Sequence, residues 1–284
     1  MTVFPARAVD PACRLLQALT VAAALLAPPA ALAIGHLPAT AADDDSAGRP
    51  GPNIPEPMVF DLIRPLGVRQ GELEVNVLGL KPLSRLSTSD RQFDFISGSD
   101  DVTSRRSGLE LAPEVEFGVF DNFAVELELP IAHGELSAVK GAVQYTFTAG
   151  TSRQFSHGVQ SILFHDLSSH SMASSLLYLA GYRFSPRWST LAMLGANREF
   201  GGDNPGSRTL GIFNATLFAE MDPRWTLGLE TNYANTARGN ASLLVMPQVH
   251  ARLSQRFSSQ FGIGTQKREG SVAAELVFRL VAEL

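Results

Sequence analysis

The chain has 284 residues, a net charge of −5 and a hydrophobic fraction of 45%. A mildly acidic chain without a Lys/Arg-rich run is a poor candidate for binding nucleic acid, so no nucleic-acid partner is expected. Its single cysteine, Cys13, excludes a disulfide framework and a paired-cysteine zinc site. The sequence contains no phosphate-binding glycine loop or nucleotide fingerprint, and we predict neither a cofactor nor a metal.

The N-terminus has the organisation of a secretory signal peptide. Arg7 and Arg14 precede the apolar run 15–26, and residues 31–33 supply the small residues of a cleavage site. The run is shorter than the roughly 20 residues that a spanning helix needs. We therefore predict a cleaved signal peptide at residues 1–33. Its removal changes the net charge from −5 to −6, because two arginines and one aspartate leave with it.

Residues 34–70 are predicted to form a flexible periplasmic N-terminal extension. Residues 34–57 are rich in Pro, Ala and Gly and include the acidic triplet 43–45, which is more typical of a solvated linker than of a cation site. Residues 58–69 are apolar enough to form either an adapter or an additional strand, and both interpretations stay open.

A turn pattern of Ser or Asp, one free residue, a donor side chain and an aromatic residue then recurs at a nearly fixed period. The aromatic residues of the copies are 32, 33, 37 and 32 positions apart, at Phe123, Phe155, Trp188, Trp225 and Phe257. Ser and Asp suit tight turns because their side chains accept hydrogen bonds from nearby backbone amides. Between copies there is room for one strand out, a loop and one strand back, which predicts an up-and-down antiparallel meander.

Apolar and polar side chains alternate between these turns, which predicts strands. The alternation is clear in residues 72–77, whereas the strands between residues 159 and 220 have mixed faces. Twelve strands are predicted, at residues 72–77, 109–117, 123–129, 139–147, 159–166, 172–184, 188–198, 209–220, 225–233, 243–253, 257–265 and 272–280. Pro113 and Pro247 lie inside two of these strands and predict either bulges or different strand boundaries.

The positions of the aromatic residues favour a membrane barrel over a soluble sandwich. They flank the predicted turns, as in the girdle of an outer-membrane barrel, whereas a sandwich would place them mid-strand in its core. The predicted girdle consists of Phe123, Phe184, Trp188, Trp225 and Phe257. We therefore predict an all-β fold, an up-and-down antiparallel transmembrane β-barrel of about 12 strands at residues 71–284. If residues 90–93 are a further turn, residues 58–65 become a strand and the count rises to fourteen.

If the apolar residues of each strand face lipid, their polar neighbours line the lumen. The predicted lumen-lining set is Glu72, Glu74, Glu110, Glu114, Glu116, Glu126, Glu128, Lys140, Glu230, Arg252, Glu275 and Arg279. The glutamates concentrate on the first three strands, so one wall is acidic and needs water, bases or an inserted loop. Loop 81–106 is predicted to fold inward as a plug that neutralises this wall. Its basic residues are Lys81, Arg85, Arg91, Arg105 and Arg106.

Residues 114–118, 121–123 and 126–130 resemble bacterial outer-membrane β-barrels of the phenol-degradation meta-pathway group. The resemblance covers residues 71–284 and implies a transporter or channel, with outer-membrane lipid and the barrel-assembly machinery as partners. The chain departs from such barrels at its end, because residues 281–284 contain no aromatic residue.

An enzymatic interpretation rests on residues that lie together at a predicted outer loop. His165, Asp166, Ser169 and His170 include the residue types of an acyl-transfer site or a metal site. Their closeness in sequence does not bring a nucleophile, a base and an orienting group together in space. No catalytic residue is predicted, and a rim lipid hydrolase is the least favoured alternative.

The leading hypothesis is a narrow outer-membrane channel or transporter for small solutes, hydrophobic ones included. The second is a non-transporting structural or surface barrel with a filled lumen, which small barrels often have. Solute flux into liposomes distinguishes the two hypotheses. Absence of flux, even after deletion of residues 85–104, would favour the structural barrel. The sequence specifies neither the solute nor the oligomeric state.

Overall fold

The computed structural model describes residues 51–60, 62–83, 92–94, 99–102, 109–201, 208–236, 241–268 and 271–284. The predicted signal peptide 1–33 and residues 34–50 of the predicted extension lie outside the described residues and stay predictions. In the described part of the chain, no helix has both the length and the apolar character needed to cross a membrane.

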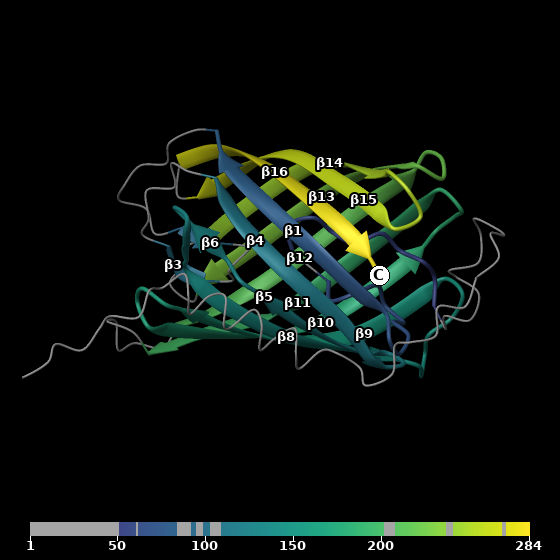
Figure 1. Ribbon diagram of the computed structural model, residues 1–284, viewed down its shortest axis with the longest axis horizontal. Coiled ribbons are helices and arrows are strands. Elements are labelled where there is room, and N and C mark those ends of the chain that lie inside the picture. The colour runs from purple at the N-terminus through teal and green to yellow at the C-terminus, as the bar shows by residue number, and fades with distance from the viewer. Residues whose placement is uncertain are drawn as a thin grey trace, which may run out of the picture. The chain divides into compact units, whose positions relative to one another are not determined.

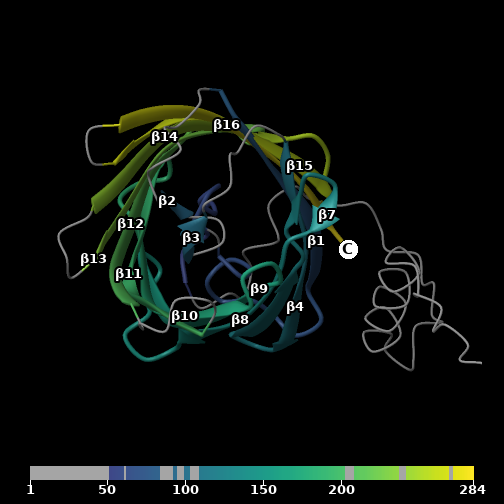
Figure 2. The same ribbon diagram turned by 90° about the vertical axis from the view of Figure 1, so that its left-hand side faces the viewer.

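Twelve antiparallel strands form a closed barrel (Figures 1 and 2). The barrel strands are β1 (Leu73–Pro82), β4 (Glu110–Phe120), β5 (Phe123–Glu128), β8 (Ala138–Phe147), β9 (Phe155–Asp166), β10 (Ser171–Arg183), β11 (Trp188–Gly201), β12 (Arg208–Glu220), β13 (Trp225–Thr236), β14 (Ala241–Arg252), β15 (Phe257–Arg268) and β16 (Ser271–Glu283). Each strand pairs with its neighbour along the barrel, and β1 closes the ring by pairing with both β16 and β4. The predicted all-β fold with twelve strands is confirmed.

Four short strands lie outside this ring pattern. β6 (Ile131–Ala132) and β7 (Glu135–Leu136) form a small hairpin beside β4, and β2 (Gln92–Asp94) pairs with β3 (Ser99–Val102) in a separate two-stranded sheet. The alternative with fourteen barrel strands does not hold, because the described residues between 58 and 65 are not in a strand.

The two prolines inside barrel strands do not cause bulges. Pro113 of β4 pairs with Val77 of β1, and Pro247 of β14 pairs with Leu229 of β13, with an unchanged register on both sides of each proline. The irregularity in β4 lies instead between Gly118 and Phe120. The prediction of a bulge or a wrong boundary at these prolines was therefore wrong, and the ladders lose only the hydrogen bonds that proline cannot donate.

The repeated turn motif forms the short hairpins at one end of the barrel. The side chains of Ser152, Ser185, Asp222 and Ser254 each accept hydrogen bonds from the backbone amides two and three residues further along the chain, at 2.7–3.3 Å. The carbonyl before each aromatic accepts a hydrogen bond from the next hairpin, as in Glu220 N to Arg187 O at 2.8 Å. These bonds join neighbouring turns into a rim, which explains the period of about two strands.

The outer face of the barrel is apolar. Leu176, Leu194 and Leu280 are 64%, 61% and 55% exposed, and they project from strand positions that alternate with buried ones. The predicted girdle residues Phe184, Trp188, Trp225 and Phe257 are also exposed at the short-turn end, and Phe123 stacks on Phe120 there at 4.7 Å. An apolar outer band edged by aromatic residues is typical of a barrel whose outside is solvated by lipid.

The chain enters the barrel before its first strand begins. Residues 51–70 start beside Ser156 at the short-turn end, run into the lumen and return to the same end, where Asn122 N donates to Val68 O at 2.7 Å (Figure 2). We call residues 51–70 the luminal segment. The predicted flexible extension does not hold for this segment, because most of its residues are buried against the inner wall. It is neither an adapter outside the barrel nor a strand.

Candidate functional site

The carboxylate of Glu230 on β13 holds three consecutive residues of the luminal segment. Glu230 Oε2 accepts hydrogen bonds from the backbone N–H groups of Met58 at 2.9 Å and Val59 at 3.1 Å, and Oε1 accepts one from Phe60 at 2.8 Å. Such bonds to a charged acceptor are roughly twice as strong as bonds between neutral groups. Glu230 is fully buried, so these three amides replace the water that its carboxylate would otherwise bind.

Two asparagines on adjacent strands complete the seat of Glu230. Asn214 Nδ2 on β12 lies 3.1 Å from Oε1, and Asn232 Nδ2 on β13 lies 3.0 Å from it. Residues 230 and 232 share the inward face because side chains in a strand alternate with period two. Sequence reasoning placed Glu230 in the lumen but missed both asparagines, since an uncharged polar residue in a strand gives little signal.

Arg64 anchors the turning point of the luminal segment. Its φ of 63° lies in the left-handed region, which is costly for a residue with a side chain and persists where the surroundings fix it. Arg64 N donates to Glu116 Oε2 at 2.8 Å, and Arg64 O accepts from Gln144 Nε2 at 3.0 Å. The guanidinium contacts the carboxylates of Glu74 and Glu72. Backbone and side chain thus fix the same residue to the wall.

The charge of Arg64 is matched by the wall that it meets. Burial alone would lower the pKa of Arg64, but the nearby carboxylates of Glu74, Glu56, Glu116 and Glu72 raise this pKa above its ordinary value. Arg64 therefore stays cationic while enclosed in the barrel. The acidic wall was predicted to receive basic residues from loop 81–106. The base observed at this wall, Arg64, belongs to the luminal segment.

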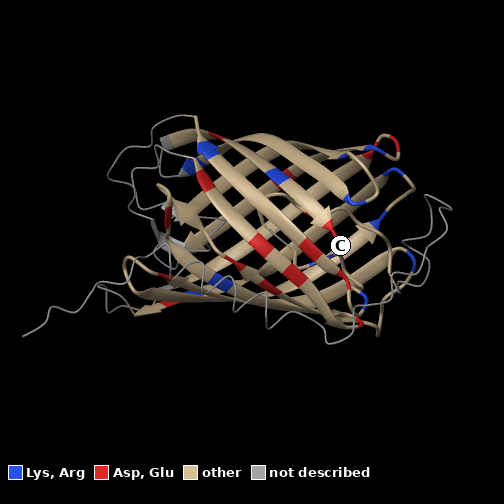
Figure 3. Ribbon diagram, in the orientation of Figure 1, with Lys and Arg blue, Asp and Glu red and all other residues tan. Residues whose placement is uncertain are grey.

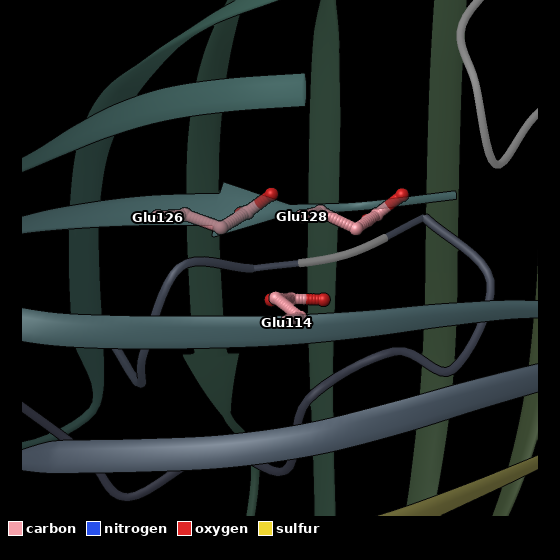
Figure 4. A group of neighbouring side chains, drawn as sticks. All are labelled: Glu114, Glu126 and Glu128. Carbon is pink, nitrogen blue, oxygen red and sulfur yellow. The ribbon is translucent and has the colours of Figure 1, made fainter. Parts of the chain in front are cut away.

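A second cation serves the other part of the acidic wall. Lys140 Nζ on β8 lies 3.0 Å from Glu126 Oε1 and also contacts Glu128 Oε2. Glu114 faces these two carboxylates across the β4–β5 pair (Figure 4). One carboxylate oxygen from each of the three glutamates lies within 4.8 Å of the others, so their geometry would also admit a hard cation. In this structure the ammonium group of Lys140 supplies positive charge there.

The inner wall also carries large apolar side chains, which lie among buried polar ones such as Asn197, Thr216 and Gln248. Strands β10, β11, β12 and β14 turn large side chains inward, and these pack with the luminal segment into one buried cluster. Its wall members include Leu177, Leu179, Leu191, Met193, Leu210, Ile212, Leu244 and Met246. Its members from the luminal segment are Ile54, Met58, Val59, Phe60, Leu62 and Leu66. The prediction that polar side chains line the lumen therefore holds only in part on this side, where large apolar residues face inward as well.

Small residues of the wall make room for the luminal segment. A Cβ at Gly181 would collide with Cδ1 of Ile54, and a Cβ at Gly262 would collide with Cε of Met58. At the entrance, the guanidinium of Arg183 holds the carbonyl of Asn53 and pairs with Glu220 Oε1 at 2.6 Å. The wall thus carries recesses and anchors shaped for these residues.

Most of the predicted lumen-lining residues share the inward face. Glu74, Glu114, Glu116, Glu126, Glu128, Lys140, Glu230, Glu275 and Arg279 are buried, and Glu72 and Glu110 are partly buried at inward positions. Arg252 ends β14 and is exposed at the short-turn rim. Whether these residues select solutes stays a prediction.

The predicted loop plug is only partly described. Arg85, Arg91, Arg105 and Arg106 lie outside the described residues, so their part in a plug stays a prediction. Lys81 belongs to β1 rather than to a loop, and its side chain is exposed at an outward position of that strand.

The residues of the enzymatic interpretation form a turn. Asp166 Oδ1 accepts hydrogen bonds from Ser168 N, Ser168 Oγ and Ser169 N at 2.7–2.8 Å, and Ser169 Oγ bonds to Ser171 Oγ at 2.8 Å. The rings of His165 and His170 lie 6.5 Å apart. Asp166 therefore caps the turn between β9 and β10, and the serine hydroxyl bonds to another serine instead of a histidine.

Comparison with known proteins relates the fold to porins. The KdgM porin matches with a TM-score of 0.52 and 10% identity over 74% of this chain and 98% of its own, and the NanC porin with 0.53 and 8% over 74% and 100%. No curated protein matches in sequence. A family model described as HAEPLYID-like matches residues 53–283, which include nearly all of the luminal segment. The predicted phenol-degradation group is named by none of these three.

Proposed function

Because this match spans most of its length, the chain belongs to the HAEPLYID-like family, and we propose that it forms an outer-membrane channel for small solutes whose lumen is closed by its own luminal segment. The observation that carries the proposal is the seat of Glu230, where three consecutive backbone amides of the segment are bound. Water or a solute can take the place of the segment's backbone N–H groups at this carboxylate. The hydrogen bonds between paired strands cannot be exchanged in this way without opening the barrel.

The twelve-stranded fold favours a lumen that can open over one that is permanently filled. Side chains usually fill the interior of an eight-stranded barrel, and the interior widens with strand number. In this twelve-stranded barrel the extra space holds a segment whose two ends both lie at the short-turn end. A re-entrant segment can leave through the end by which it entered without breaking any strand pairing.

The inner wall defines the solutes that the open channel would pass. Withdrawal of the luminal segment leaves one side, formed by β10–β12 and β14, where large apolar residues lie among uncharged polar ones, and an acidic side formed by β1, β4 and β5. We propose that the channel passes small apolar solutes and prefers cations to anions. This agrees with the resemblance to the phenol-degradation meta-pathway group, which is part of the proposal.

Planar-bilayer conductance and liposome swelling test the function. We expect low flux for the mature chain and high, cation-selective flux after deletion of residues 52–66. The matched deletion of residues 85–104 is expected to leave flux low, because the luminal segment remains. In the open barrel, the double substitution Glu114→Gln and Glu126→Gln should reduce cation selectivity.

The second candidate function is a structural barrel with a permanently filled lumen. It is favoured by the buried apolar clusters that the wall and the segment share. Absence of solute flux after both deletions, in barrels that still migrate anomalously on gels when unheated, would support this structural function and refute the channel.

A further inference from the structure

Three of the repeated turns place an arginine directly before an outward-facing aromatic residue. The pairs are Arg187 with Trp188, Arg224 with Trp225, and Arg256 with Phe257. All three arginine side chains are exposed, and Arg153 and Arg252 add two more exposed guanidinium groups at the same end. Figure 3 shows basic segments at the turns at the right-hand end of the barrel.

The turns use the backbone of these arginines but not their charge. The amide of Arg187 binds Ser185 Oγ and its carbonyl binds Glu220 N, and Arg224 makes the corresponding bonds. Among the residues that the structure describes, the guanidinium groups of Arg187, Arg224 and Arg256 form no ion pair. The repeated turns therefore need only the backbone of the residue at these positions. They do not require its side chain to be that of arginine.

Three acidic groups of this rim are already used within the protein, whereas Glu283 at the end of β16 is exposed there. Asp222 Oδ1 accepts the amides of its own turn, Asp121 Oδ1 accepts Gln70 N at 2.9 Å, and Glu220 pairs with Arg183. The local excess of positive charge contrasts with the net charge of −5 for the whole chain.

The depth of the arginines indicates what they meet. Aromatic residues of a girdle lie at the level of the lipid headgroups, and the residue that precedes each one lies at the turn, at or just beyond this level. Guanidinium binds phosphate through a planar fork of donors. We propose that the rim of Arg187, Arg224 and Arg256 binds the headgroups of anionic phospholipids in the leaflet that contacts the short turns.

The two tryptophans make this proposal measurable, because the chain contains no others and each follows a rim arginine. The full mature chain would be reconstituted in zwitterionic phosphatidylethanolamine vesicles with phosphatidylglycerol. Tryptophan quenching would be compared when either lipid carries brominated acyl chains at equal mole fraction. We expect stronger quenching by the brominated anionic lipid, with each arginine contributing at most about fivefold to local preference. The chain's net negative charge alone predicts the opposite order.

Variants separate the rim from the barrel as a whole. The preference is the ratio of quenching by the brominated anionic lipid to quenching by the brominated zwitterionic lipid. Arg187→Gln with Arg224→Gln should bring this ratio close to one, whereas Arg187→Lys with Arg224→Lys should retain most of the preference. Lys81→Gln with Lys267→Gln removes the same charge at the other end and should leave the preference unchanged. Equal quenching by the two lipids in the unmodified chain, or an unchanged preference in the folded glutamine variant, would overturn the proposal.

Discussion

Replacement of Glu230 by glutamine should release the luminal segment while leaving the barrel closed. The amide group fills the same volume but presents a donor where Oε2 accepts the N–H groups of Met58 and Val59. If the amide turns over, Phe60 N–H loses its acceptor instead. A hydrogen bond to a charged group contributes about 1.5–3 kcal/mol, so one or two lost bonds cost roughly 2–6 kcal/mol. At about 1.4 kcal/mol for each factor of ten, the withdrawn state becomes roughly 30-fold to 10⁴-fold more populated.

Accessibility of a cysteine measures this population directly. Removal of the predicted signal peptide leaves the mature chain without cysteine, so Val59→Cys, at a position 3% exposed, introduces a single thiol in the lumen. Maleimide labelling of this thiol should accelerate at least about 30-fold when Glu230→Gln is added, in proportion to the withdrawn fraction. Glu135→Gln, an exposed glutamate on β7, serves as the control and should not change the rate. An unchanged labelling rate in Glu230→Gln would show that its carboxylate does not retain the segment.

Three further substitutions distinguish the segment from the barrel. Lys140→Gln removes the cation from two buried glutamates and should lower the free energy of unfolding by about 3–5 kcal/mol, measured by urea titration in lipid; an unchanged midpoint would contradict this. Gly181→Val fills the recess that holds Ile54, so it should raise conductance while gel migration of the unheated barrel stays normal. Gly195→Ala meets the carbonyl of Leu176 on the neighbouring strand and should destabilise the barrel by about 1–3 kcal/mol without raising conductance. If Gly195→Ala raised conductance and Gly181→Val did not, the luminal segment would not pack at Gly181.

The barrel was predictable because its outer face obeys a local rule. A residue that faces lipid is apolar and its neighbour faces the other way, so alternation along one strand reveals the strand without knowledge of its partners. The turns were equally local, since Ser185 and Asp222 bind amides within three residues. For these reasons all twelve strands were found, with boundaries that differ by a few residues.

The luminal segment was not predictable in the same way because its partners are remote in sequence. Met58 binds a carboxylate 172 positions away, and nothing near residue 58 indicates an acceptor. A signal was present in the strands with mixed faces. Leu177 and Leu191 are apolar at positions that face inward, where a water-filled pore would favour polar residues. Apolar residues on both faces of a barrel strand therefore indicate an apolar occupant of the lumen.

Occupancy of the lumen by residues 51–70 is proposed to control passage through the barrel. Met58→Cys with Gly262→Cys places two thiols across the contact between the segment and β15. A short, reducible bifunctional thiol reagent would then fix the segment in the lumen. In planar bilayers of the Glu230→Gln background we predict low conductance after cross-linking and an increase on reduction. The same conductance before and after reduction, with cross-linking confirmed by mass spectrometry, would show that the segment does not control passage.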